Sequence, residues 1–262
     1  MWISHNLKQR LHDPNIGFSA FLTPKKFSVL DFHYAADFNA KEIAKLDVPL
    51  FLGLSGGMDS EYVLLSFYRN KIPIKPIIVK TNGNSYETSY AFFICKKLGI
   101  QPIVLTLNDQ HYLAIFENLI VKRLNGVGIY TVPSILASNV AKNHNGILIT
   151  GNHLIEDGDV CWNIDCSEWD FYTQVLSNEN DINFFSYTPE MSYSMFKELD
   201  GSPANELKER LYGIGYRPKM KPIHGTSFNV EANKFLPLVR PNSQHVFGRK
   251  NDVLRQMENW NV

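Results

Sequence analysis

Four short apolar segments alternate with helical patterns between residues 48 and 150, and this alternation limits the possible folds more than any other property of the chain. Each apolar segment is bounded by turn residues, as expected of a strand that is buried on both faces. The predicted strands are 48–54, 74–81, 101–107 and 146–150, and the predicted helices are 59–69, 85–98, 109–123 and 133–143. Strands and helices in this alternation form right-handed βαβ units. The predicted fold class is therefore α/β, with a doubly wound parallel sheet.

The alternation is absent outside this region. Residues 1–47 contain scattered proline and glycine, and we expect an irregular segment with one short helix at 39–46. After residue 151 the pattern predicts helices only, at 189–199, 203–212 and 244–258. The predicted organisation is an irregular N-terminal segment (1–47), an α/β nucleotide-binding domain (48–160) and a mainly helical C-terminal portion (161–262) that covers the substrate site.

Composition excludes several classes of protein. The 262 residues carry 26 basic and 26 acidic side chains, so no overall charge attracts nucleic acid or a membrane surface. No apolar stretch approaches the ~20 residues of a membrane-spanning helix, and the first residues lack the apolar core of a secretion signal. Three cysteines are too few for a disulfide scaffold. We therefore expect a cytoplasmic location.

The charges are unevenly distributed along the chain. Residues 1–150 carry 15 basic and 10 acidic groups, residues 151–200 carry one and eleven, and residues 201–262 carry ten and five. The acidic block and the basic tail are either a metal-rich loop facing an anion-binding arm or solvated faces that neutralise each other.

The residues that indicate chemistry are 54–60, Leu-Ser-Gly-Gly-Met-Asp-Ser, which end the first strand and begin a helix. Gly56 and Gly57 allow the backbone to approach a ligand closely. Ser55 and Ser60 offer hydroxyl groups, and the helix N-terminus offers N–H groups and a positive dipole end. This combination predicts a phosphate cradle. It lacks the lysine of a Walker A loop, which favours a departing pyrophosphate over a transferred γ-phosphoryl group.

Asp59 is the exception within this motif, because its carboxylate would repel a phosphate. A cation between the two would resolve the conflict, so the sequence predicts Mg²⁺ that bridges Asp59 and phosphate oxygens.

The hexapeptide SGGMDS after an apolar strand resembles the signature of the PP-loop, or N-type ATP pyrophosphatase, superfamily. This Rossmann-like group of adenine nucleotide α-hydrolases includes asparagine synthetase, NAD synthetase, 7-cyano-7-deazaguanine synthase and tRNA-modifying enzymes. Two further segments support the resemblance, residues 81–100 and the Ile-Thr-Gly-Asn of residues 149–152. The resemblance covers about residues 45–160.

The resemblance also implies site residues. Adenine would lie against the end of the second strand, at Val79, Lys80 and Thr81, and Gly151 would lie beside the nucleotide. A second acidic group would help Asp59 to hold Mg²⁺. Because the spacing after Gly151 departs from the family pattern, that group is either Glu156 or Asp157, with Asp159 as a third and weaker candidate.

The implied activity is that of an AMP-forming ATP pyrophosphatase, a ligase that adenylates a carboxylate or carbonyl oxygen of a small molecule or nucleobase. Ammonia or another nucleophile would then displace AMP. A basic residue from the C-terminal portion reaches the phosphates in several members, and Lys219 or Lys221 could do so here. Two alternatives stay open: a tRNA- or nucleic-acid-modifying enzyme, which the neutral charge does not favour, and a non-catalytic nucleotide-binding protein.

Departures from the family narrow the possibilities. Glutamine-dependent members carry an N-terminal glutaminase domain with a cysteine directly after the initiator methionine. Here the second residue is Trp2, and the 47 residues before the predicted α/β domain cannot hold such a domain. Ammonia would therefore be free or come from a partner. The four-cysteine zinc site of the deazaguanine branch is absent. Cys161 and Cys166 could form a sulfur-transfer pair, although free cysteines in proteins are more often buried structural residues. A homo-oligomer is possible, and the acceptor substrate is not determined.

Overall fold

The three-dimensional structure is a computed structural model. It describes residues 2–6, 8–9, 13, 20–81, 83–116, 118, 131–152, 174, 177–217 and 250–261. Within these ranges, no helix has the length and apolarity needed to cross a membrane.

A five-stranded sheet lies at the centre of the fold, and every pair of neighbouring strands is parallel. The spatial order is β5-β4-β3-β6-β7. The strands are β3 (Leu50–Gly53), β4 (Lys75–Lys80), β5 (Ile103–Thr106), β6 (Ile147–Thr150) and β7 (Ile182–Asn183). The chain builds outward from β3 to β5, then returns to add β6 and β7 on the other side. The predicted doubly wound parallel α/β sheet is confirmed.

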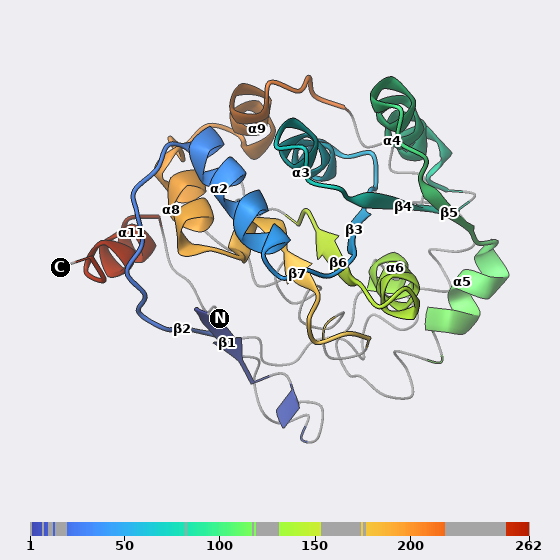
Figure 1. Cartoon of the computed structure of the whole chain (residues 1–262), viewed down its shortest axis with the longest axis horizontal. Helices are drawn as coiled ribbons and strands as arrows, with labels where there is room; N and C mark the ends of the chain where they lie inside the picture. Colours follow the sequence, from blue (N-terminus) through green and yellow to red (C-terminus); the bar gives the residue numbers. More distant parts are fainter. Residues whose placement is uncertain are drawn as a thin grey trace.

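Helices cover both faces of this sheet (Figure 1). The helix α6 (Thr131–Asn143) packs on one face, against β3, β4 and β6. The helices α3 (Met58–Arg69) and α4 (Ser85–Leu98) pack on the other, against β3 and β4. Successive strand residues point to opposite faces. Phe51 therefore belongs to the smaller apolar cluster between the sheet and α6, and Leu52 belongs to the main core. Both faces are therefore apolar, as the continuous hydrophobic strands predict.

The N-terminal segment is more regular than expected. The strands β1 (Ile3–His5) and β2 (Ala20–Leu22) form a separate antiparallel pair. The helix α2 (Phe32–Ala44) begins seven residues before the short helix predicted at 39–46. It starts there because the carboxylate of Asp31 accepts a hydrogen bond from the backbone N–H of Tyr34, at 3.0 Å, and so caps the first turn.

The C-terminal part contributes one strand and several helices. Besides β7, which the pattern did not predict, the described elements are η2 (Phe184–Ser186), α8 (Pro189–Lys197), α9 (Ala204–Tyr212) and α11 (Lys250–Glu258).

The helix α5 (Asp109–Phe116) lies at the opposite end of the molecule (Figure 1). Predicted helices at 85–98, 189–199 and 203–212 match α4, α8 and α9 to within two residues at each end.

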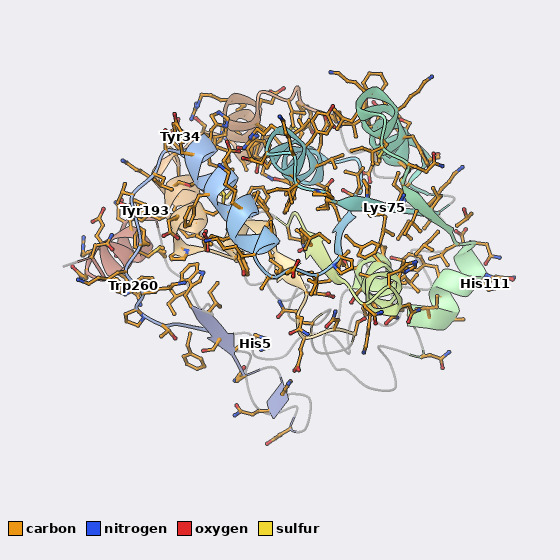
Figure 2. The ribbon with its side chains drawn as sticks, viewed as in Figure 1. His5, Tyr34, Lys75, His111, Tyr193 and Trp260 are labelled. Carbon is orange, nitrogen blue, oxygen red and sulfur yellow. The ribbon has the colours of Figure 1, made fainter. Side chains whose placement is uncertain are left out.

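The two ends of the chain share the main core. Trp2 donates its indole N–H to the carbonyl of Ser186, at 3.0 Å, and its ring meets Trp260 edge to face. Figure 2 shows Trp260 near Tyr193 of α8, whose hydroxyl donates to Glu258 at 2.9 Å.

The domain boundaries at residues 47 and 160 stay a prediction.

Candidate functional site

The predicted phosphate loop lies where the strand order reverses. It follows β3, and β6 lies beside β3 although the chain visits two other strands in between. In open α/β sheets, ligands bind outside the carboxyl ends of the strands at such a reversal. Both the loop that follows β3 and Gly151, the residue after β6, lie at this edge.

The loop has a backbone that only glycine can adopt at its centre. Gly56 has a φ of +91°, and a Cβ placed there would lie 1.9 Å from the carbonyl oxygen of Glu87. Ser55 and Ser60 brace the loop: their hydroxyl oxygens are 3.2 Å apart, and the hydroxyl of Ser60 donates to the carbonyl of Gly57 at 3.1 Å. The N-cap residue of α3 is Gly57, which has no side chain to accept from the N–H groups of the first turn, so among the described residues this helix end offers donors to an anion.

Gly151 closes the other side of the loop. A Cβ at this position would lie 3.0 Å from Cα of Ser60 and 3.1 Å from its backbone nitrogen. Because the end of β6 lies so close to the first turn of α3, a side chain here would push the two apart. The structure thus brings the predicted Gly151 into contact with the predicted phosphate loop.

The carboxylate of Asp59 is held by two residues of α9. Lys208 donates from Nζ to Oδ2 at 3.1 Å, and Tyr212 donates from its hydroxyl to Oδ1 at 2.8 Å. The two donors are four residues apart on one helix and therefore point to the same side. Figure 1 shows α9 lying beside α3, and the two helices are in contact.

The hydroxyl of Tyr212 is fixed by aromatic packing. Its ring stacks on Tyr62, with ring centroids 4.5 Å apart, and is also nearly parallel to the rings of Phe32 and Phe185, at 5.8 and 6.0 Å. Burial, followed by the nearby charge of Asp59, raises the pKa of Tyr212 well above its ordinary value. The phenol therefore keeps its proton and stays a donor to Asp59.

A second basic residue reaches the loop from beyond α9. The guanidinium of Arg217 donates to the carbonyl of Gly56 at 3.2 Å and forms an ion pair with Glu61 in the first turn of α3. It also lies over the ring of Tyr90, 4.5 Å from the centroid. Arg217 thus links the phosphate loop, α3 and α4.

The predicted adenine positions lie at the same edge of the sheet. Val79 and Lys80 end β4, and Asn84 organises the turn that follows. The amide of Asn84 donates to the carbonyl of Val79 and accepts from the N–H of Thr81, both at 2.8 Å. The side chain of Lys80 is exposed. Adenine binding by Val79, Lys80 and Thr81 stays a prediction.

Both oxygens of the Asp59 carboxylate accept hydrogen bonds from α9, and Mg²⁺ binding at Asp59 stays a prediction. One carboxylate oxygen faces an ammonium group and the other a phenol, both within hydrogen-bond distance. Across the described part of the chain, no group of three His, Cys, Asp or Glu side chains could hold a metal ion. Glu156 and Asp157, the predicted second ligands, lie outside the described residues, and so do Lys219, Lys221, Cys161 and Cys166.

Sequence reasoning missed three residues that the structure brings to the site, Lys208, Tyr212 and Arg217. Lys208 and Tyr212 are separated from Asp59 by about half of the chain, and their i, i+4 spacing is common on helices. Only the packing of α9 on α3 distinguishes this pair from the other lysine and tyrosine residues of the C-terminal portion.

No protein-family model matches the chain, and no curated protein matches it significantly. Among solved structures, NMN synthetase from Francisella tularensis is 16% identical, with a TM-score of 0.44 over 90% of this chain and 97% of its own. NH3-dependent NAD synthetase from Campylobacter jejuni is 16% identical, with a TM-score of 0.41 over 88% and 91%. Glutamine-dependent NAD+ synthetase from Acinetobacter baumannii is 11% identical, with a TM-score of 0.43 over 86% and 49%.

The fold class follows from the sheet itself. The chain has the doubly wound α/β fold, with the loop at the carboxyl edge of the sheet, that its resemblance to the PP-loop superfamily implied.

Proposed function

We propose that this chain is an ATP-dependent, AMP-forming synthetase of the PP-loop type. The observation that supports the proposal most is the glycine loop at the reversal of strand order, with the uncapped end of α3 behind it and Gly151 against its first turn. Close backbone approach, serine hydroxyl groups and a helix N-terminus together suit a polyphosphate. A polyphosphate at this position has its nucleoside end near the end of β4, at Val79, Lys80 and Thr81.

The proposed reaction has two steps. A carboxylate oxygen of a small acceptor attacks the α-phosphorus, the bond from that phosphorus to the bridging oxygen breaks, and pyrophosphate leaves with the electron pair. Ammonia then attacks the acyl carbon, loses a proton and displaces AMP, so that an amide forms. The loop and the N-terminus of α3 bind the pyrophosphate as it leaves, and this electrostatic stabilisation is the main contribution of the protein.

The products of ATP test the proposal. The purified protein is incubated with ATP, ammonium and a panel of small carboxylic acids and nucleobases, and mass spectrometry distinguishes AMP from ADP. AMP and pyrophosphate in equal amounts, dependent on one acceptor, would support the proposal. ADP and phosphate as the products, or no acceptor-dependent cleavage at all, would contradict it.

A pair of glycine variants links that activity to the loop. Gly57→Ala adds a methyl group where we expect the phosphates to approach, and among the described atoms its Cβ meets the Ser55 hydroxyl oxygen alone, at an ordinary 3.4 Å. We expect ATP binding to weaken about tenfold or more while the fold persists. Gly215→Ala is the matched control, because a Cβ there meets no atom of the described residues within 4 Å. Equal ATP binding by the two variants would contradict the position assigned to the phosphates.

A further inference from the structure

The charges around the phosphate loop are balanced by one C-terminal segment. The first turn of α3 carries two carboxylates, Asp59 and Glu61, and each has a cation from residues 208–217. Arg217 pairs with Glu61, and Lys208 pairs with Asp59. Because each carboxylate would otherwise repel a phosphate, this pairing decides what the loop can bind.

Lys208 is buried more deeply than the carboxylate that it contacts. Its side chain is 5% exposed, against 20% for Asp59. Lysine is rarely buried to this extent unless it is paired. Among the residues that the structure describes, Asp59 is the one hydrogen-bond partner of Lys208, although an ammonium group has three N–H donors. Through this contact the ammonium group lies at the first turn of α3.

The position of Lys208 does not depend on its own flexible side chain alone. Tyr212, one turn further along α9, binds the other oxygen of the same carboxylate and is locked by stacking on Tyr62. Both oxygens of Asp59 are therefore held by α9, and the ammonium group stays next to this carboxylate in the first turn of α3.

We propose that Lys208 is a positioning residue that serves as the resident cation of Asp59, so that the loop binds a polyphosphate without a divalent ion at this carboxylate. The inference rests on the proposed function for the class of ligand. It goes further because it assigns the neutralisation of the Asp59 carboxylate to the ammonium group of Lys208, and not to the Mg²⁺ that the motif predicts.

Mn²⁺ binding to the nucleotide-free protein, followed by electron paramagnetic resonance, tests this assignment directly. We expect weak binding to the wild-type protein and binding about tenfold tighter to Lys208→Met, in which the carboxylate of Asp59 has lost its ammonium partner. The double variant Lys208→Met/Asp59→Asn should return to weak binding. If the wild-type protein binds Mn²⁺ as tightly as Lys208→Met, the proposal is wrong.

ATP binding in EDTA, measured by isothermal titration calorimetry, is the second test. We expect the wild-type dissociation constant to change less than about threefold between EDTA and Mg²⁺, and Lys208→Met to lose about tenfold or more in EDTA. The double variant should recover most of that loss, because it removes both charges. Loss of wild-type binding in EDTA, with no effect of Lys208→Met, would overturn the proposal.

Controls separate charge compensation from folding. Arg210 lies on the same helix, and its one ion pair with a described residue is the exposed pair with Asp200, so Arg210→Gln should match the wild type in both tests. The double variant replaces a buried charge pair with neutral side chains, which proteins often tolerate. If ATP binds but AMP never forms, the proposed function fails while Lys208 keeps its role. If ATP does not bind at all, the Mn²⁺ test still decides.

Discussion

Replacing the buried carboxyl group of Asp181 with an amide should change how the stability of the fold depends on pH. Asp181 is 3% exposed and joins three elements of the sheet region. It precedes β7, and its carboxyl group accepts hydrogen bonds from the backbone N–H of Leu148 in β6, at 2.8 Å, and from the hydroxyl of Ser138 in α6. Burial raises its pKa from 3.8 to about 6, although these hydrogen bonds act in the opposite direction.

The sign and size of the effect follow from this pKa. The folded state keeps a proton that the unfolded chain has lost, so the free energy of unfolding falls as pH rises from about 4 to about 6. A shift of about 2 pH units corresponds to about 3 kcal/mol at neutral pH. In Asp181→Asn, the amide oxygen still accepts from Leu148 and the amide nitrogen can donate to Ser138. The variant should therefore be about 3 kcal/mol more stable than the wild type at neutral pH and nearly equal to it near pH 4.

Urea denaturation followed by tryptophan fluorescence, from about pH 4.5 to about pH 7.5, measures this difference. Asp200→Asn is the control. Hydrogen bonds from Ser202, then Arg210, lower the pKa of Asp200 to about 2, so its contribution is lost only as pH falls below about 4. Its effect should be constant across the measured range. If the gain in Asp181→Asn is also constant with pH, the carboxyl group is not protonated in the folded state and the reasoning is refuted.

Two further predictions concern the loop and the contact between the N-terminal and C-terminal parts. Gly56→Ala should abolish ATP binding and lower the melting temperature, because its Cβ would overlap the carbonyl oxygen of Glu87; unchanged calorimetric traces would show that the loop has another conformation. Asn39→Ala should cost about 2–3 kcal/mol in urea denaturation, since the buried amide donates to the carbonyl of Phe184 and accepts from the hydroxyl of Thr188, both at 2.8 Å. A loss below about 0.5 kcal/mol would mean that these groups find other partners.

The sheet region could be predicted from the sequence because its signals are local. Each strand is a short apolar run between turn residues, and the helix predicted at 85–98 is followed by Gly99, a residue type that readily takes the left-handed conformation found at this C-cap. The strand β7 escaped prediction because two residues cannot display a periodicity. The early start of α2 could have been found from Asp31, a favoured N-cap residue placed before a run of apolar spacing.

The candidate site could be predicted only in part, because only some of its residues are marked by local sequence signals. The loop after β3 and Gly151 are local features of strand ends, and the structure brings them into contact. The partners of Asp59 depend on how α9 packs on α3, and nothing near Lys208 in the sequence marks that packing. The predictions for Glu156, Asp157, Lys219 and Lys221 concern residues outside the described ranges, and they stay predictions.

The ion pair between Asp59 and Lys208 also bears on how this chain folds. It joins residues that are 149 positions apart, so the two groups can meet only after the intervening chain has found its place. Contacts of such long range form late and slow folding. During synthesis, the glycine loop leaves the ribosome long before α9 does. A chain cut ahead of residue 204 would keep the whole SGGMDS motif and lose both groups that hold its aspartate.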